Sequence, residues 1–188
     1  FEAKFSLPSF DIESSNLTNI AETLQKLLLT ALELSDSTIL KNSSYEVEAN
    51  LEFDRNWGLG SSSTLVSLVA QWIGCNAFEL NTRVFGGSGY DIACAQSSTP
   101  IVYELQKKNP VFKGVDFQPP FASQIWFIHL NQKQNSRSEI GRFNLDNDYL
   151  KEIEEINNLT MGFQEARTVE EFSQCMDEHE QLIASILE

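Results

Sequence analysis

Residues 57–64 read Trp-Gly-Leu-Gly-Ser-Ser-Ser-Thr and run directly into Leu-Val-Ser-Leu-Val-Ala-Gln-Trp-Ile at residues 65–73. Gly58 and Gly60 have no Cβ atom, so the backbone there can take positive φ angles and approach a ligand closely. The serines that follow supply hydroxyl groups and a helix N-cap. Apolar residues then recur at helical spacing as far as Ile73. The stretch therefore predicts a tight turn that opens a helix with one buried face.

The start of such a helix is a candidate phosphate site. Its first amide groups have no partner within the helix, and the helix dipole places partial positive charge at this end. The residues that would line the site are Gly58, Leu59, Gly60, Ser61, Ser62 and Ser63. No lysine follows Gly60, so the turn is not a Walker loop, and amide and hydroxyl groups alone would hold a phosphate. By themselves these residues fit a plain helix cap equally well.

The composition is acidic, with 27 Asp and Glu residues, 13 Lys and Arg residues and a formal net charge of −14. So acidic a chain, without a dense basic run, is not expected to bind nucleic acid. No long apolar segment or signal peptide is visible, and we expect no membrane association. Cys75, Cys94 and Cys175 are widely spaced and form no CxxC pair, which predicts free thiols in the reducing cytoplasm.

Apolar and polar residues alternate most clearly over residues 45–53, just before the glycine turn. One face of a strand here would carry Tyr45, Val47, Ala49, Leu51 and Phe53. The pattern therefore predicts a strand, then the turn, then the helix of residues 61–73.

The rest of the chain mixes strand and helix patterns, which predicts an α+β fold. Further strands are expected over residues 1–8, 100–105, 111–117 and 124–130, the last of them apolar and buried. Further helices are expected over residues 21–34, 78–85, 92–96, 139–143, 146–166 and 168–187. Thr168 and Glu171 have the spacing of a capping box at the start of the last helix. A boundary near residues 107–120 divides the chain into domains 1–118 and 119–188.

A second glycine turn lies at residues 85–93, which read Phe-Gly-Gly-Ser-Gly-Tyr-Asp-Ile-Ala. It places Asp91 in the first turn of the next expected helix. This carboxylate is either a helix N-cap or a group that accepts a proton in a reaction.

The two turns together resemble motifs of the GHMP small-molecule kinases. Residues 58–63 are similar to the GLGSSA-type phosphate loop of that superfamily, and residues 87–91 resemble its second turn, Ser-Gly-x-Asp. Residues 89–93 spell the signature of its GYDIA-type subgroup. Residues 130–138 resemble the strand and turn that mevalonate kinases place near the start of their C-terminal domain.

The resemblance implies a two-domain kinase that uses ATP and Mg²⁺. Residues 1–118 would belong to a mixed domain with a sheet and the phosphate-binding helix, and residues 119–188 would open a ferredoxin-like domain. The acceptor would be a hydroxyl or a phosphate on a small molecule, with mevalonate or phosphomevalonate as the leading class. Whether the protein forms a homodimer stays an open question at this point.

The resemblance also assigns roles to individual residues. Asp91 would be the catalytic base, and residues 58–63 would hold the phosphates of ATP. Ser62, or Ser61 as the alternative, would place a hydroxyl on Mg²⁺. Ser88, Gly89 and Arg137 would contact the acceptor, with Lys133 beside Arg137. Trp57 packs either on the adenine or on the core.

Two parts of the family pattern are not in the sequence. The first motif, which brings a lysine, is expected before Phe1, and the glycine-rich third motif after Glu188, so we expect a middle portion of a longer protein. Glu79 is the carboxylate nearest to the family's Mg²⁺-binding glutamate. Its spacing to Asp91 differs from the family's by about one residue, which favours an ordinary charge on a helix surface.

Three other functions stay open at this point. An ATP-dependent decarboxylase of a phosphorylated mevalonate would release CO₂. A non-catalytic module of the same fold would bind a nucleotide or metabolite and tolerate loss of the Asp91 carboxylate. A structural acidic helical domain would have no nucleotide affinity at all.

Overall fold

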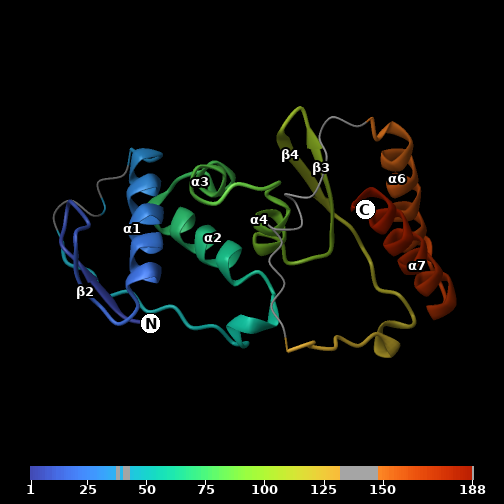
Figure 1. The fold of residues 1–188 in the computed structure, drawn as a ribbon, viewed down its shortest axis with the longest axis horizontal. Coiled ribbons are helices and arrows are strands. Elements are labelled where there is room, and N and C mark those ends of the chain that lie inside the picture. The colour runs from blue at the N-terminus through green and yellow to red at the C-terminus, as the bar shows by residue number, and fades with distance from the viewer. Residues whose placement is uncertain (37–38, 40–42, 132–147, 188) are drawn as a thin grey trace. The chain divides into compact units, whose positions relative to one another are not determined.

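The computed structural model describes residues 1–36, 39, 43–131 and 148–187 (Figure 1). The chain divides into two compact units, Phe1–Val115 and Asp116–Glu188, and each is described by itself. The division lies close to the expected boundary between residues 118 and 119.

The first unit is built on helices. They are α1 (Thr18–Glu33), α2 (Ser61–Ile73), α3 (Ala77–Val84) and the short α4 (Tyr90–Ala95), with a 3₁₀ turn, η1 (Arg55–Trp57), before α2. Helices α1, α2 and α3 pack against one another, and α4 packs on α2 and α3. The most deeply buried large side chains are Leu27, Val66, Ile73, Leu80 and Ile92. The core therefore joins all four helices, and the helices expected over residues 21–34, 61–73, 78–85 and 92–96 are confirmed with small shifts at their ends.

Two antiparallel hairpins complete the described part of this unit. β1 (Ala3–Phe5) pairs with β2 (Ile12–Ser15), where the sequence predicted one strand over residues 1–8. β3 (Ile101–Gln106) pairs with β4 (Asn109–Gly114), in the register Ile101 to Gly114. Lys107 and Lys108 both take positive φ in the connecting turn, as a two-residue hairpin turn of type I′ requires. The α+β class is thus confirmed.

The strand predicted over residues 45–53 is wrong. This segment has no strand pairing in the structure, and Val47 on its apolar face is 65% exposed. An alternating pattern becomes a strand only where a neighbouring strand accepts its backbone hydrogen bonds, and none of the described residues does so. η1 precedes the glycine turn instead, and the Asp54 side chain caps it by accepting a hydrogen bond from the Asn56 amide at 2.7 Å.

In the second unit, the strand predicted over residues 124–130 is also wrong. A 3₁₀ turn, η2 (Ala122–Gln124), ends where the strand was expected, and residues 125–130 then continue without pairing. Phe127 is 95% exposed, although the sequence predicted a buried strand. Burial of such a strand needs covering layers on both faces, and the described part of this unit contains no sheet.

In the described part of the second unit, α6 (Leu150–Glu165) and α7 (Val169–Leu187) pack against each other. The predicted capping box is confirmed, because the Glu171 amide donates to Thr168 Oγ1 at 3.2 Å and the Thr168 amide donates to Glu171 Oε2 at 3.3 Å. Phe117, Phe121 and Phe163 surround Phe172, with ring centroids 5.1 to 6.3 Å from it. The helix predicted over residues 139–143 lies outside the described residues.

Replacing Leu27 by alanine tests the core of the first unit. Leu27 is fully buried among α1, α2 and α3, so we expect the Leu27→Ala variant to lose about 2–5 kcal/mol of unfolding free energy. Leu68→Ala is the matched control, because Leu68 on α2 is 51% exposed, and we expect it to lose about 1 kcal/mol or less. Denaturant unfolding followed by tryptophan fluorescence measures both. Equal losses at the two positions would contradict the described core.

Candidate functional site

The first glycine turn takes the conformation that the sequence predicted. Gly58 ends η1 with φ 78°, and Gly60 is the N-cap of α2 with φ 75°. Both values lie in the left-handed region, where a side chain would be strained. Gly60 has no side chain to cap the helix, and the first backbone bond of α2 joins the Thr64 amide to the Gly60 carbonyl at 3.0 Å. The amides of residues 61–63 thus precede the first helical bond, as a phosphate site requires.

The space beside this turn is open, and this bears on whether a phosphate group fits there. A Cβ atom built on Gly58 or on Gly60 would meet no atom within 4 Å. Ser62 is exposed, whereas Ser61 and Ser63 are half-buried. The turn therefore has open space beside Gly58 and Gly60, and Ser62 is the most exposed of its three serine residues. Amide donors of this kind suit phosphate oxygens, and a serine hydroxyl oxygen is the type of ligand that Mg²⁺ accepts.

The second glycine turn presents Asp91. Gly89 takes φ 84° as the N-cap of α4, and Asp91 lies in the first turn of that helix. The Asp91 residue is exposed, and in the described ranges no lysine or arginine forms an ion pair with it. The Ser88 hydroxyl oxygen accepts a hydrogen bond from the Tyr90 amide at 3.3 Å, which shapes the turn from within.

Packing of α2 against α4 brings the two predicted motifs onto neighbouring helices. Ile92 and Ala93 are buried on α4, one and two residues after Asp91, and Ile92 belongs to the same core cluster as Val66 of α2. In Figure 1 the end of α2 that is entered from η1 is the end nearer to α4. The core thereby fixes α2, which begins with Ser61 directly after the first turn, and α4, which carries Asp91.

The other residues named as candidates are Glu79, Arg137 and Lys133. Arg137 and Lys133 lie outside the described residues. Glu79 forms an ion pair with Arg83 one helical turn away, at 2.6 Å, and both side chains are about half exposed. This pairing supports the interpretation of Glu79 as a surface charge. Nowhere in the described chain do three His, Cys, Asp or Glu side chains gather to hold a metal ion.

Two residues that the sequence did not single out hold the second turn. Asn81, buried on α3, donates from Nδ2 to the Gly86 carbonyl at 2.9 Å, and the hydroxyl of Tyr103 on β3 donates to the Ser88 carbonyl. A polar asparagine on an otherwise apolar face of the predicted helix is a sequence signal that could have identified Asn81. No sequence signal marks Tyr103, because its contact depends on how the β3–β4 hairpin packs beside α4.

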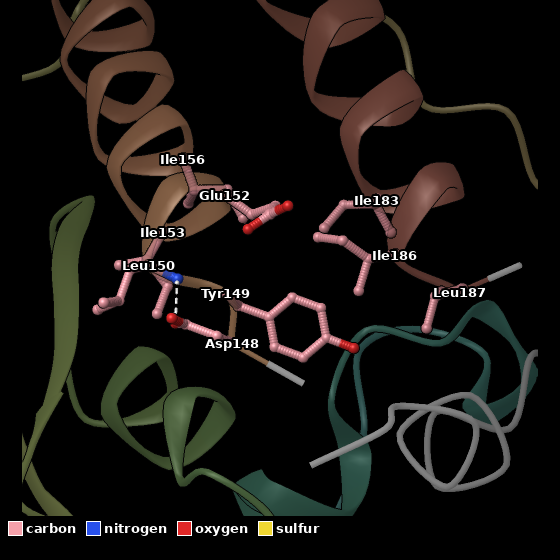
Figure 2. Close-up of a pocket in the computed structure, with 9 residues that line it drawn as sticks. All are labelled: Asp148, Tyr149, Leu150, Glu152, Ile153, Ile156, Ile183, Ile186 and Leu187. Atoms are coloured by element: carbon pink, nitrogen blue, oxygen red, sulfur yellow. Dashed lines mark hydrogen bonds between the residues drawn. The ribbon is translucent and has the colours of Figure 1, made fainter. Parts of the chain in front are cut away.

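The described surface also contains an apolar hollow, between α6 and α7 of the second unit (Figure 2). Its volume is about 370 Å³, and its lining residues are Asp148, Tyr149, Leu150, Glu152, Ile153, Ile156, Ile183, Ile186 and Leu187. None of the predicted site residues is among them. The described lining residues include two carboxylates and no lysine or arginine, which disfavours phosphate, so we do not take this hollow as the candidate nucleotide site.

Within the described ranges, no helix has the length and apolar character that crossing a membrane requires. Comparisons of the chain with protein-family models, with curated proteins and with solved structures each gave no match. The candidate site therefore rests on the residues and contacts of the two turns.

Alanine substitutions at two glycines separate backbone strain from packing in the second turn. Gly87 and Gly89 both have positive φ, so each change introduces about 1–2 kcal/mol of strain. At Gly89 the new Cβ would also lie 3.0 Å from Phe78 Cδ1, whereas at Gly87 it would meet nothing within 4 Å. We expect Gly89→Ala to destabilise the protein more than Gly87→Ala in denaturant unfolding. The packing of Phe78 under the turn would be wrong if the two variants were equally stable.

Alkaline pH should destabilise the first unit through its tyrosines. Burial raises the pKa of Tyr103, and a hydrogen bond with Cys94, followed by burial, raises the pKa of Tyr90. The fold therefore favours the neutral phenols. Their contribution is complete below about pH 10, the ordinary tyrosine pKa, and is lost as the pH rises through the raised pKa values. Thermal unfolding measured from about pH 8 to about pH 11 should show this loss. The loss of thermal stability with rising pH should be smaller in Tyr103→Phe. An equal loss in that variant would contradict the contribution of the raised Tyr103 pKa.

Proposed function

We propose that this chain carries the nucleotide-binding part of an ATP-dependent small-molecule kinase of the GHMP type. The observation that carries the proposal is a pair of left-handed glycine turns that open two packed helices. The first turn offers open amides, and the second presents a carboxylate. The acceptor is a hydroxyl or phosphate group on a small molecule, with mevalonate and phosphomevalonate as the first candidates.

In this proposal, residues 58–63 bind the phosphates. Their amides and hydroxyls donate to phosphate oxygens at the positive end of α2, which offsets locally the repulsion expected from a net charge of −14. ATP would supply the γ-phosphoryl group, and Mg²⁺ would neutralise charge on the phosphates as it is transferred. The exposed Ser62 hydroxyl is the group that would bind the metal ion.

Asp91 acts on the acceptor. Its carboxylate takes the proton from the acceptor hydroxyl as that oxygen forms a bond to the γ-phosphorus and the bond to ADP breaks. Ser88 and Gly89 lie directly before this helix and would contact the acceptor, and Arg137 would bind an acidic group on it. A phosphate acceptor is already ionised at neutral pH, so it would depend less on Asp91 than an alcohol does.

The proposal extends to the rest of the chain. Residues 1–118 would form the mixed domain, residues 119–188 would begin a ferredoxin-like domain, and the protein would act in the cytoplasm. A non-catalytic nucleotide-binding module is the second candidate. It is favoured by the exposure of Asp91 and by the lack of an ion-pair partner for it among the described residues, since a base is normally oriented by a neighbouring charge.

Exchange of Asp91 for asparagine separates these functions. In the full-length protein we expect ADP release from MgATP in the presence of one acceptor from a panel of mevalonate, phosphomevalonate, homoserine and galactose. Asp91→Asn keeps the shape of the side chain but cannot accept the proton, so kcat for an alcohol should fall about 10²–10⁴-fold while ATP still binds. Asp177→Asn, at an exposed acidic position on α7, is the control and should keep full activity.

The other outcomes identify the alternatives. ATP binding that is indifferent to Asp91→Asn, without turnover on any acceptor, would favour the binding module. Release of CO₂ from a phosphorylated mevalonate would identify the decarboxylase. Failure of the native protein to bind ATP would contradict the proposal altogether.

A further inference from the structure

The turn before α4 needs support from outside itself. Gly86, Gly87 and Gly89 take φ angles of 76°, 91° and 84°, and glycine loses more conformational freedom on folding than any other residue. A turn with three glycines would by itself let α4 begin in several ways. The direction of the Asp91 side chain depends on where that helix begins.

The beginning of the turn is tied to α3. Asn81 is only 8% exposed, and its Nδ2 donates to the Gly86 carbonyl at 2.9 Å. Its own carbonyl accepts the amides of Phe85 and Gly86 at 2.8 and 2.9 Å. These three bonds fix the backbone as it leaves α3, but they end at Gly86, four residues before Tyr90, the first residue of α4.

The end of the turn is tied to β3 through one side chain. Tyr103 donates its hydroxyl to the Ser88 carbonyl and packs edge-on against the Tyr90 ring, with centroids 5.6 Å apart. A Cβ atom added to Gly89 would lie 3.4 Å from the Tyr103 hydroxyl. Tyr103 therefore lies against three successive residues that directly precede Asp91.

We propose that Tyr103 is the positioning residue for Asp91: its hydroxyl bond to the Ser88 carbonyl fixes where α4 begins and so where the Asp91 carboxylate points. This inference rests on the proposed function, in which Asp91 is the base. Tyr103 acts through the backbone of residues 88–90 and touches neither the acceptor nor the nucleotide. Because the reacting atoms of a transfer must be aligned closely, a shift of about 1 Å in such a base can lower the rate roughly 100-fold.

Tyr103→Phe tests the role with the smallest change, since it removes the hydroxyl and keeps the ring that packs on Tyr90. We expect kcat to fall roughly 10- to 100-fold and KM for ATP to stay unchanged, because the phosphate-binding turn at residues 58–63 is untouched. Hydrogen–deuterium exchange over residues 86–93 should become several-fold faster. This readout needs no catalysis, and a thermal unfolding midpoint near that of the native protein would show that the fold is kept.

Tyr45→Phe is the matched control. The Tyr45 hydroxyl also donates to a backbone carbonyl, that of Ile39, and its ring also packs edge-on against an aromatic neighbour, Trp72, at 5.8 Å. It lies in no turn that leads to Asp91. Removal of the Tyr45 hydroxyl should change neither kcat nor hydrogen–deuterium exchange over residues 86–93.

Failure of this inference and failure of the proposed function give different results. Unchanged exchange over residues 86–93 in Tyr103→Phe, or an unchanged kcat in a protein that turns over, would overturn the positioning role alone. A native protein without turnover on any acceptor would overturn the proposed kinase and the catalytic role of Asp91 with it. Faster exchange together with a lower kcat and a constant KM for ATP would support both.

Discussion

Gly60 takes a left-handed conformation immediately before α2, and this backbone constraint determines how the first turn of the helix is presented. A serine or aspartate at the N-cap would bond to the first amides with its own side chain. Glycine cannot, and its positive φ turns the incoming chain so that nothing lies within 4 Å of the place where its side chain would be. The amides of residues 61–63 therefore have no side-chain cap from residue 60, in a chain whose charge otherwise repels anions.

The hydrophobic core holds this helix start in place. Val66, Val69, Ala70 and Ile73 are buried along α2, so the helix cannot rotate or shift without exposing them. Ile92 of α4 joins the same cluster, which couples the second turn to the first through packed side chains. Asn81 and Tyr103 then define the path of the backbone around Asp91. The second glycine sequence becomes a defined turn because side chains from α3 and β3 bond to its backbone.

Features with local causes could be predicted from the sequence. Periodic apolar residues and glycine turns predicted α2, α3 and α4, and a three-residue spacing predicted the capping box of Thr168 and Glu171. The strands expected over residues 45–53 and 124–130 were wrong because a strand depends on a partner distant in sequence, which an alternating pattern cannot reveal. Tyr103 was missed for the same reason. Its bond to Ser88 spans 15 residues and exists only once the β3–β4 hairpin has formed.

Titration of the full-length protein with MgATP, followed by the backbone amide resonances, tests most directly whether the start of α2 binds phosphate. We predict saturable shifts concentrated at residues 58–64, and their loss in a Gly60→Ala variant, whose strained turn would change the path of the backbone. Absence of MgATP binding would contradict a phosphate site at the start of α2. So would shifts confined to the hollow between α6 and α7, because that surface has carboxylates where a nucleotide needs donors.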